Sequence, residues 1–199
     1  MKVIREVEYQ AEHLQWLDGK LKVALPVTAS NYQSIGCFDM TLEHAGSMVL
    51  LASSELYGTM LSLKRVAFES TGRGLWLRHC ATPDQRGKFA RGKLQLSFAE
   101  LLKEVETAVG SAGTPLSSLQ TGTWKIMNDY THTGIRQVSS RHSQETVAGR
   151  YPPETVVGAL RIGGLLALLA AGELASYTGN EALISEIQAK AGEYGRPCA

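Results

Sequence analysis

The 199-residue sequence contains none of the cysteine patterns that build disulfide frameworks or zinc sites. Its three cysteines, Cys37, Cys80 and Cys198, are an odd number and include no CxxC spacing. This usage argues against a disulfide framework and favours a reducing compartment. HExxH and Glu-x-x-His patterns are absent too, and Asp129 with His132 offers only two ligands, too few for a metal site. We therefore expect neither a metal nor another cofactor.

Long hydrophobic runs and an excess of one charge are also lacking. The net charge of +1 gives no global attraction to nucleic acid or to an anionic membrane. The most apolar run, residues 162–171, is shorter than the ~20 residues that cross a bilayer. Residues 1–13 are charged and contain no apolar signal-peptide core. We expect a cytoplasmic protein that makes no membrane contact.

Strand signals and nucleotide-binding motifs are equally scarce. Aromatic residues make up 7% of the chain, and alternation of apolar and polar residues is weak. There is no Walker loop, GxGxxG or GxSxG motif. Long stretches instead follow the helical period, and a chain of this length can bury a core without staples. The sequence predicts an all-α fold, a single-domain helix bundle of about five to seven helices.

The periodicity and the breaking residues predict where these helices lie. Expected helices cover residues 7–24, 31–53, 55–81, 96–110, 117–141, 153–177 and 180–190. Ser97 is the expected N-cap of the fourth helix, and Gly179 is the expected C-cap of the sixth. Residues 82–93 are expected to form a polar loop. We divide the chain into an N-terminal helical segment (1–30), a bundle core (31–191) and a C-terminal tail (192–199).

One predicted helix, residues 55–81, carries a charged row beside large apolar residues. At about 100° per residue, Arg65, Glu69, Arg73, Trp76 and His79 share one arc about 120° wide. The i, i+4, i+8 spacing of the Arg–Glu–Arg row allows ion pairs along the helix. A face that mixes tryptophan with charge is not simply a solvated face.

A second predicted helix, residues 117–141, carries a matching row. Asn128, His132 and Arg136 share an arc flanked by Trp124. In an antiparallel pair the two rows would face each other. The expected polar cluster consists of Arg65, Glu69, Arg73, Asn128 and His132. It is either a satisfied structural network, which is the more common case, or a site. If the row is buried, Glu69→Ala should cost ~3–5 kcal/mol.

The pattern R-x3-E-x3-R-x2-W-L at residues 65–77, followed by NDYTH at residues 128–132, resembles an uncharacterised family of bacterial helical proteins. That family resembles the AbiV-type abortive-infection proteins and the HEPN superfamily. The resemblance covers residues 31–141. It implies a HEPN-like helix bundle that forms a homodimer and serves a bacterial defence or toxin–antitoxin system.

The resemblance also implies candidate catalytic residues, because many HEPN proteins are metal-independent ribonucleases with an Arg-x(4–6)-His motif. The matches in this chain are Arg73 to His79 and Arg136 to His142. Histidine would act as the acid–base group, and arginine would hold the phosphate. We expect His132 as the first acid–base candidate and His79 as the second, with Arg73 or Arg136 on the phosphate. His142 has the character of a surface residue.

A basic stretch gives a candidate RNA contact. Its four cations surround Phe89 with no acid between them: Arg86, Lys88, Arg91 and Lys93. They form either a solvated loop, the more common case, or a phosphate-binding surface.

Three functions stay open at this point. The first is a ribonuclease. The second is a non-enzymatic helical module that binds a protein partner, such as an antitoxin or immunity protein. The third is a binder of a small anionic ligand, with Arg65, Arg73 and Arg136 as clamps. An open cleft at the polar cluster would favour the first or third function, and a closed, fully paired cluster would favour the second.

Overall fold

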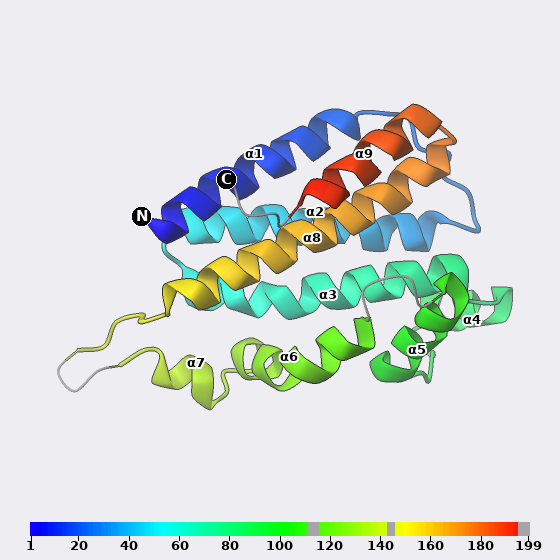
Figure 1. Ribbon diagram of the computed structural model, residues 1–199. Helices are drawn as coiled ribbons and strands as arrows, with labels where there is room; N and C mark the ends of the chain where they lie inside the picture. Colours follow the sequence, from blue (N-terminus) through cyan, green and yellow to red (C-terminus); the bar gives the residue numbers. More distant parts are fainter. Residues whose placement is uncertain (111–115, 143–145, 195–199) are drawn as a thin grey trace.

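The computed structural model describes residues 1–110, 116–142 and 146–194, in which nine helices and no strand are found (Figure 1). The helices are α1 (Lys2–Lys20), α2 (Tyr32–Ser53), α3 (Tyr57–His79), α4 (Pro83–Ala90), α5 (Phe98–Val109), α6 (Leu116–Thr131), α7 (Ile135–Ser139), α8 (Pro153–Thr178) and α9 (Glu181–Glu193). The all-α prediction is confirmed. The range of five to seven helices is too low, because two short helices were not predicted.

The first of these is α4, so the prediction of a loop at residues 82–93 is wrong. The Thr82 hydroxyl accepts a hydrogen bond from the Gln85 backbone N–H, and the Gln85 side chain accepts one from the Thr82 N–H. Pro83 occupies the first turn, where its missing N–H costs nothing. This capping box starts a helix although Gly87 lowers the local propensity.

The second is α7, which exists because the predicted helix 117–141 breaks in two. The chain turns after Thr131: Thr133 has a φ of 55°, and the Gly134 N–H donates to the Asp129 carbonyl oxygen at 2.6 Å. A Cβ at position 134 would lie 2.7 Å from the Asp129 Cα, so this close turn requires glycine. His132 and Arg136 therefore do not share a helical face.

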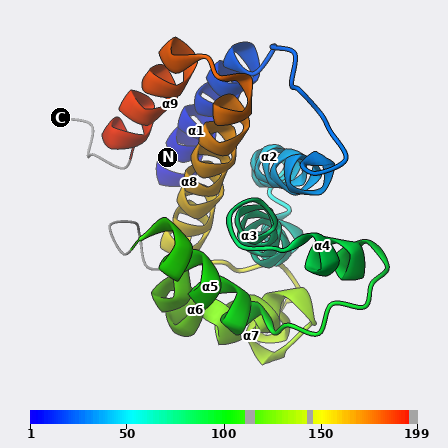
Figure 2. The same ribbon diagram turned by 90° about the vertical axis from the view of Figure 1, so that its right-hand side faces the viewer.

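The helices are arranged in layers around α8 and the antiparallel hairpin of α2 and α3 (Figure 2). The helices α1 and α9 pack on one side of α8, and α5 and α6 pack on α3 at the other side of the molecule. Leu17 of α1 lies in an apolar cluster together with residues of α2, α8 and α9. Gly179 ends α8 in the left-handed conformation with a φ of 65°, as predicted.

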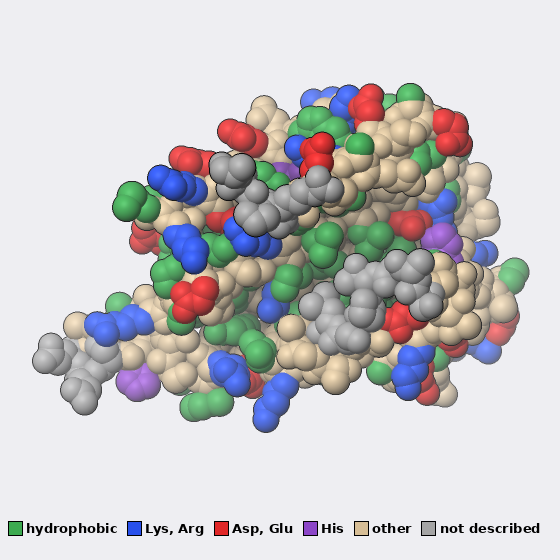
Figure 3. Space-filling view, viewed as in Figure 1, with side chains coloured by type: hydrophobic (Ala, Val, Ile, Leu, Met, Phe, Trp, Pro, Cys, Tyr) green, Lys and Arg blue, Asp and Glu red, His purple; other side chains and the backbone are tan. Residues whose placement is uncertain are grey.

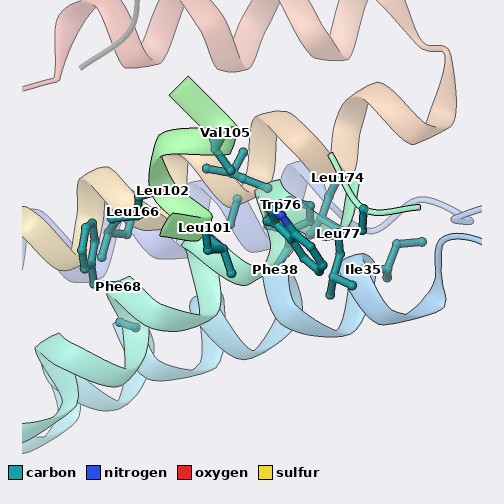
Figure 4. Packing of buried hydrophobic residues seen from close by; sticks show 14 of the residues in the cluster. Ile35, Phe38, Phe68, Trp76, Leu77, Leu101, Leu102, Val105, Leu166 and Leu174 are labelled. Atoms are coloured by element: carbon teal, nitrogen blue, oxygen red, sulfur yellow. The ribbon is translucent and has the colours of Figure 1, made fainter. Parts of the chain in front are cut away.

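The largest apolar cluster lies where α2, α3, α5 and α8 meet (Figure 4). Phe38, Phe68, Trp76 and Leu102 are fully buried there. Close approach of α2 and α3 depends on Gly74, since a Cβ at this position would lie 2.6 Å from the Phe38 ring. This packing fixes the rotation of α3 and so decides which of its residues face α5 and α6.

Among the described helices, α8 is long and apolar enough to cross a membrane by length and composition, and 61% of its most apolar window is buried inside the protein. Some of its apolar side chains face outward: Leu165 is 39% exposed. Figure 3 shows hydrophobic side chains gathered along the middle of the face that Figure 1 presents to the viewer. A core helix and a membrane span share this length and composition, so the cytoplasmic location and the lack of membrane contact stay predictions.

Candidate functional site

The charged row on α3 forms a continuous ion-pair ladder. Arg65 Nε lies 2.7 Å from Glu69 Oε1, and Arg73 Nη1 lies 2.7 Å from Glu69 Oε2. Both carboxylate oxygens of Glu69 are therefore occupied, and its side chain is only 14% exposed. The predicted i, i+4, i+8 ladder is present, and two guanidiniums sharing one carboxylate leave the row with a net positive charge.

His132 joins this ladder from the turn after α6. Arg65 Nη1 lies 2.6 Å from His132 Nε2. Because a guanidinium can only donate, this hydrogen bond requires Nε2 to be the acceptor. The structure thus brings His132 to Arg65, as the sequence predicts, although the turn rather than a helical face positions it.

Two aromatic rings cover the ladder. The Arg65 guanidinium lies 4.7 Å from the centre of the Trp124 ring on α6, and that of Arg73 lies 5.8 Å from the Phe98 ring on α5. The two rings stack on each other with centres 5.3 Å apart. These cation–π contacts stabilise the guanidiniums while excluding water from one side of the row.

Two other residues of the expected rows do not extend the ladder. Arg136 is mostly exposed, and its Nε lies 3.4 Å from Asp129 Oδ2. Its guanidinium is thus paired with Asp129 and does not join Arg65 and Arg73 in the ladder. The Oδ1 atom of Asn128 is buried on α6 and has no hydrogen-bond partner in the part of the chain that the structure describes. Trp76, which shares the predicted arc, donates instead to Glu104 on α5.

The two Arg-x(5)-His matches do not form local pairs. His79 Nε2 lies 3.0 Å from Glu173 Oε2 on α8, whereas Arg73 binds Glu69. His142 is exposed and forms an isolated antiparallel bridge with Val147. Among the described contacts, neither match places its arginine against its own histidine.

His79 instead belongs to a cluster that links α3 to α8. Arg78 donates to both the carboxylate and the backbone carbonyl of Glu173, and its guanidinium lies 4.1 Å from the centre of the Tyr177 ring. The sequence does not predict this cluster, because Glu173 lies in an apolar helix far along the chain.

A groove of about 230 Å³ opens beside Arg73. Its lining is otherwise apolar apart from one glycine: Phe89, Gly92, Leu94, Leu96, Phe98 and Leu101. The Arg73 side chain is 40% exposed, and only its Nη1 has a hydrogen-bond partner among the described residues. The groove thus combines an apolar wall with a guanidinium that has donors to spare.

The basic stretch borders this groove, but two of its four cations are used within the protein. Lys88 lies 2.7 Å from Asp84, and Arg86 Nε donates to the Leu77 carbonyl oxygen. Arg91 and Lys93 form no ion pair in the described residues. The surface available to an RNA phosphate is therefore smaller than the sequence suggests.

A buried polar network between α1, α8 and the end of α9 was also not predicted. Gln10 Nε2 donates to Glu6 Oε1 at 2.8 Å and to the Tyr194 hydroxyl at 2.7 Å. The Tyr194 hydroxyl donates to the Arg161 carbonyl oxygen, and Arg161 Nε donates to Glu6 Oε2. Gly164 leaves the space in α8 into which Gln10 and Tyr194 fit.

His13 lies beside this network and is 3% exposed. Its ring centre is 4.9 Å from that of Tyr194, and neither ring nitrogen has a hydrogen-bond partner in the described part of the chain. Burial lowers the pKa of His13. The backbone at Gly164 raises this pKa, and the positive charge of Lys190 lowers it. The sequence signal is polar residues at helical spacing along α1, on the face that also carries Leu17.

Comparison with known proteins gives a family but no described relative. A family described as a family of unknown function, DUF6988, matches residues 38–198. Neither the curated proteins nor the solved structures contain a match.

Proposed function

The chain therefore belongs to the DUF6988 family, whose function is unknown, and we propose that it is a non-enzymatic helical module that binds a protein partner. The groove beside Arg73 takes an apolar segment of the partner that carries a carboxylate. The proposal rests on one observation, the half-exposed Arg73 guanidinium at the edge of an apolar groove. Such a groove suits a leucine or phenylalanine next to an acidic residue.

The pairing of Glu69 and His132 within the ladder supports binding over catalysis, while Arg73 keeps free donors at the open groove. Glu69 is occupied by two arginines, and His132 Nε2 is occupied by Arg65, so the ladder works as a rigid support for Arg73. Burial raises the pKa of the Cys37 thiol to about 11 and also raises that of Cys80. Protonated thiols are poor nucleophiles, so neither cysteine suits covalent chemistry. A partner of the antitoxin or immunity type is consistent with the sequence resemblance.

Short peptides test the proposed groove. The probe is an acetylated, amidated Leu-Glu-Leu peptide, and the matched peptides carry Gln or Lys in place of Glu. We expect the acidic peptide to bind at least about tenfold more tightly than either, because only a carboxylate pairs with Arg73. Chemical shifts of the Trp124 indole, which stacks on the groove residue Phe98, report the binding.

Two arginine variants complete this test. Arg73→Gln should abolish the preference for Glu, whereas Arg91→Gln, which changes an arginine outside the groove lining, should leave it intact. Equal binding of the three peptides, or an unchanged preference in Arg73→Gln, would reject the groove as a site for acidic segments.

A second function, metal-independent RNA cleavage, is favoured by one observation. His132 is exposed and lies 2.6 Å from an arginine, Arg65. Once the Arg65–His132 hydrogen bond opens, His132 Nε2 would take the proton of a ribose 2′-hydroxyl, and the guanidinium of Arg65 would stabilise the charge on the attacked phosphate. The pair that would act is Arg65–His132 rather than either Arg-x(5)-His match.

Cleavage of a mixed-sequence single-stranded RNA in the presence of a chelator decides this second function. Loss of an acid–base group should lower the rate by about 10²–10⁴-fold without unfolding the bundle. His132→Ala is therefore compared with His79→Ala, which removes a histidine bound to Glu173. No cleavage by wild type, or equal cleavage by all three proteins, would leave only the binding module.

A further inference from the structure

A second cavity, of about 450 Å³, lies on a different face of the bundle, between α1 and α2. The chain segment that joins these helices swings out from the bundle instead of running straight from one to the other (Figure 2). The cavity opens beneath this segment, with Leu21, Lys22 and Leu25 on its wall. It shares no lining residue with the groove beside Arg73.

The wall of this cavity is mostly leucine. Six leucines from α1, α2, α8 and the joining segment line it: Leu14, Leu17, Leu21, Leu25, Leu42 and Leu174. Its volume falls within the range of small-molecule sites, which are apolar cavities with a few well-placed polar groups. The apolar wall therefore suits the hydrocarbon body of a small organic molecule.

The rim of the cavity is acidic. Asp39 and Glu43 lie one turn apart on α2, both are exposed, and neither has an ion-pair or hydrogen-bond partner among the described residues. On α1, Asp18 is paired with Lys22 at 3.2 Å. Three carboxylates and one ammonium give the lining a net charge of −2. Two carboxylates without counter-ions beside an apolar cavity favour a cationic group and disfavour an anionic one.

Gly46 completes the lining on the same helix. A Cβ at this position would meet no atom within 4 Å, so the space above Gly46 is open. A larger side chain can therefore enter the cavity without displacing a neighbour. Gly36, also on α2, has equally open surroundings but does not line the cavity. A larger residue at position 46 would fill the cavity. The same residue at position 36 serves as the control for the effect of the substitution on the helix.

We propose that this cavity binds a small organic cation, with its apolar body among the leucines and its ammonium group between Asp39 and Glu43. The assignment is independent of the binding module proposed above, because the two sites lie on different faces and select opposite charges. The ligand class is a primary amine attached to an aliphatic or aromatic body that fits about 450 Å³.

Three probes with one shared body test the charge selection: phenethylammonium, 3-phenylpropionate and 2-phenylethanol. Binding to the full chain is measured by NMR chemical shifts. We expect the ammonium compound to bind at least about tenfold more tightly than the alcohol, and the carboxylate to bind most weakly. Equal binding of the three, or tighter binding of the carboxylate, would overturn the proposal.

Variants locate the binding. Gly46→Leu should abolish binding of phenethylammonium by filling the cavity, and Gly36→Leu should bind like wild type. The double variant Asp39→Asn with Glu43→Gln should remove the preference for the ammonium compound over the alcohol. If Gly46→Leu retains binding while its circular dichroism matches that of Gly36→Leu, the amine binds elsewhere and the proposal is wrong.

Discussion

Glu69 is the residue on which the polar ladder depends, because its carboxylate receives both guanidiniums. Removing it leaves Arg65 with His132 as its only hydrogen-bond partner and Arg73 with none among the described residues. Both arginines keep an aromatic ring and some solvent, with side-chain exposures of 20% and 40%. The loss is therefore smaller than for a fully buried ion pair.

We expect Glu69→Ala to lower the free energy of unfolding by about 1–3 kcal/mol, below the ~3–5 kcal/mol of a fully buried row. Urea denaturation measures this difference. The matched control is Lys88→Ala, which breaks the exposed i, i+4 pair with Asp84 and should change stability by no more than ~0.5 kcal/mol. If the two variants are equally stable, the ladder contributes no more than a surface pair.

His13 should make stability depend on pH. Burial lowers its pKa in the folded protein below the ordinary value of 6.5, so the unfolded chain binds the proton more readily. Stability is then complete above the unfolded pKa and falls as the pH drops below about 6.5, with a slope of at most ~1.4 kcal/mol per pH unit from this group.

The variant His13→Phe tests this effect, because it keeps a ring against Tyr194 and removes the titration. Urea denaturation at pH 7.5, 6.5 and 5.5 should show a smaller loss of stability in the variant than in wild type. Parallel pH profiles of the two proteins would assign the acid sensitivity to groups other than His13.

At the scale of helices, glycine positions decide how closely α2 and α3 approach. Gly74 faces the Phe38 ring, whereas Gly36 on α2 has no atom within 4 Å of its Cβ position. The same substitution should therefore have opposite effects at these two sites. Alanine at position 74 adds a methyl group to a filled interface. Alanine at position 36 only replaces a residue of low helix propensity.

We expect Gly74→Ala to destabilise the protein by about 1–3 kcal/mol and Gly36→Ala to stabilise it by up to ~1 kcal/mol. Thermal unfolding followed by circular dichroism measures the change in stability of both variants, a loss in one and a gain in the other. Destabilisation by both variants would mean that Gly36 has a contact not visible in the described residues.

The sequence predicts the long helices well and the short ones poorly. The period of 3.6 identifies α2, α3, α5 and α8, because each must bury an apolar stripe over many residues. The helix α4 was missed because a capping box, Thr82 with Gln85, decides it rather than periodicity. The break after α6 was missed because one close turn at Gly134 ends a pattern that would otherwise continue.

Within the site, contacts inside one helix could be predicted from the sequence, and contacts between distant helices could not. Spacing within one helix predicts the Arg65–Glu69–Arg73 ladder, since i, i+4 neighbours meet whatever the rest of the chain does. Contacts between helices that lie far apart in the chain, such as His79 with Glu173, depend on packing that no local pattern encodes. The meeting of Arg65 and His132 was predicted from a helical arc that does not exist, and the turn produces it instead.

At the scale of the whole molecule, the Tyr194 hydroxyl at the end of α9 forms hydrogen bonds with both α1 and α8. Tyr194 lies against Gln10 of α1 and the Arg161 carbonyl of α8, so it connects three helices. Gln10 is fully buried and has no access to replacement water. The attachment of α1 to the bundle should therefore be sensitive to this hydroxyl.

We expect Tyr194→Phe to cost about 1–3 kcal/mol and to speed hydrogen exchange in α1 more than in α3. The control is Tyr32→Phe, since Tyr32 is 50% exposed and its hydroxyl accepts only from Gln33. Equal exchange in α1 of both variants would show that the Tyr194 hydroxyl does not hold this helix.

The pairing of α1 with α8 and Tyr194 also has a consequence during protein synthesis. The helix α1 leaves the ribosome long before α8 and Tyr194, which are encoded more than a hundred residues later. During this interval its future interior face is in water. That face carries Glu6, Gln10 and His13 beside Leu17, so three of its four buried residues present polar atoms to water before α8 is made. The groups that form the polar network of the folded protein are thus hydrated in the unassembled segment.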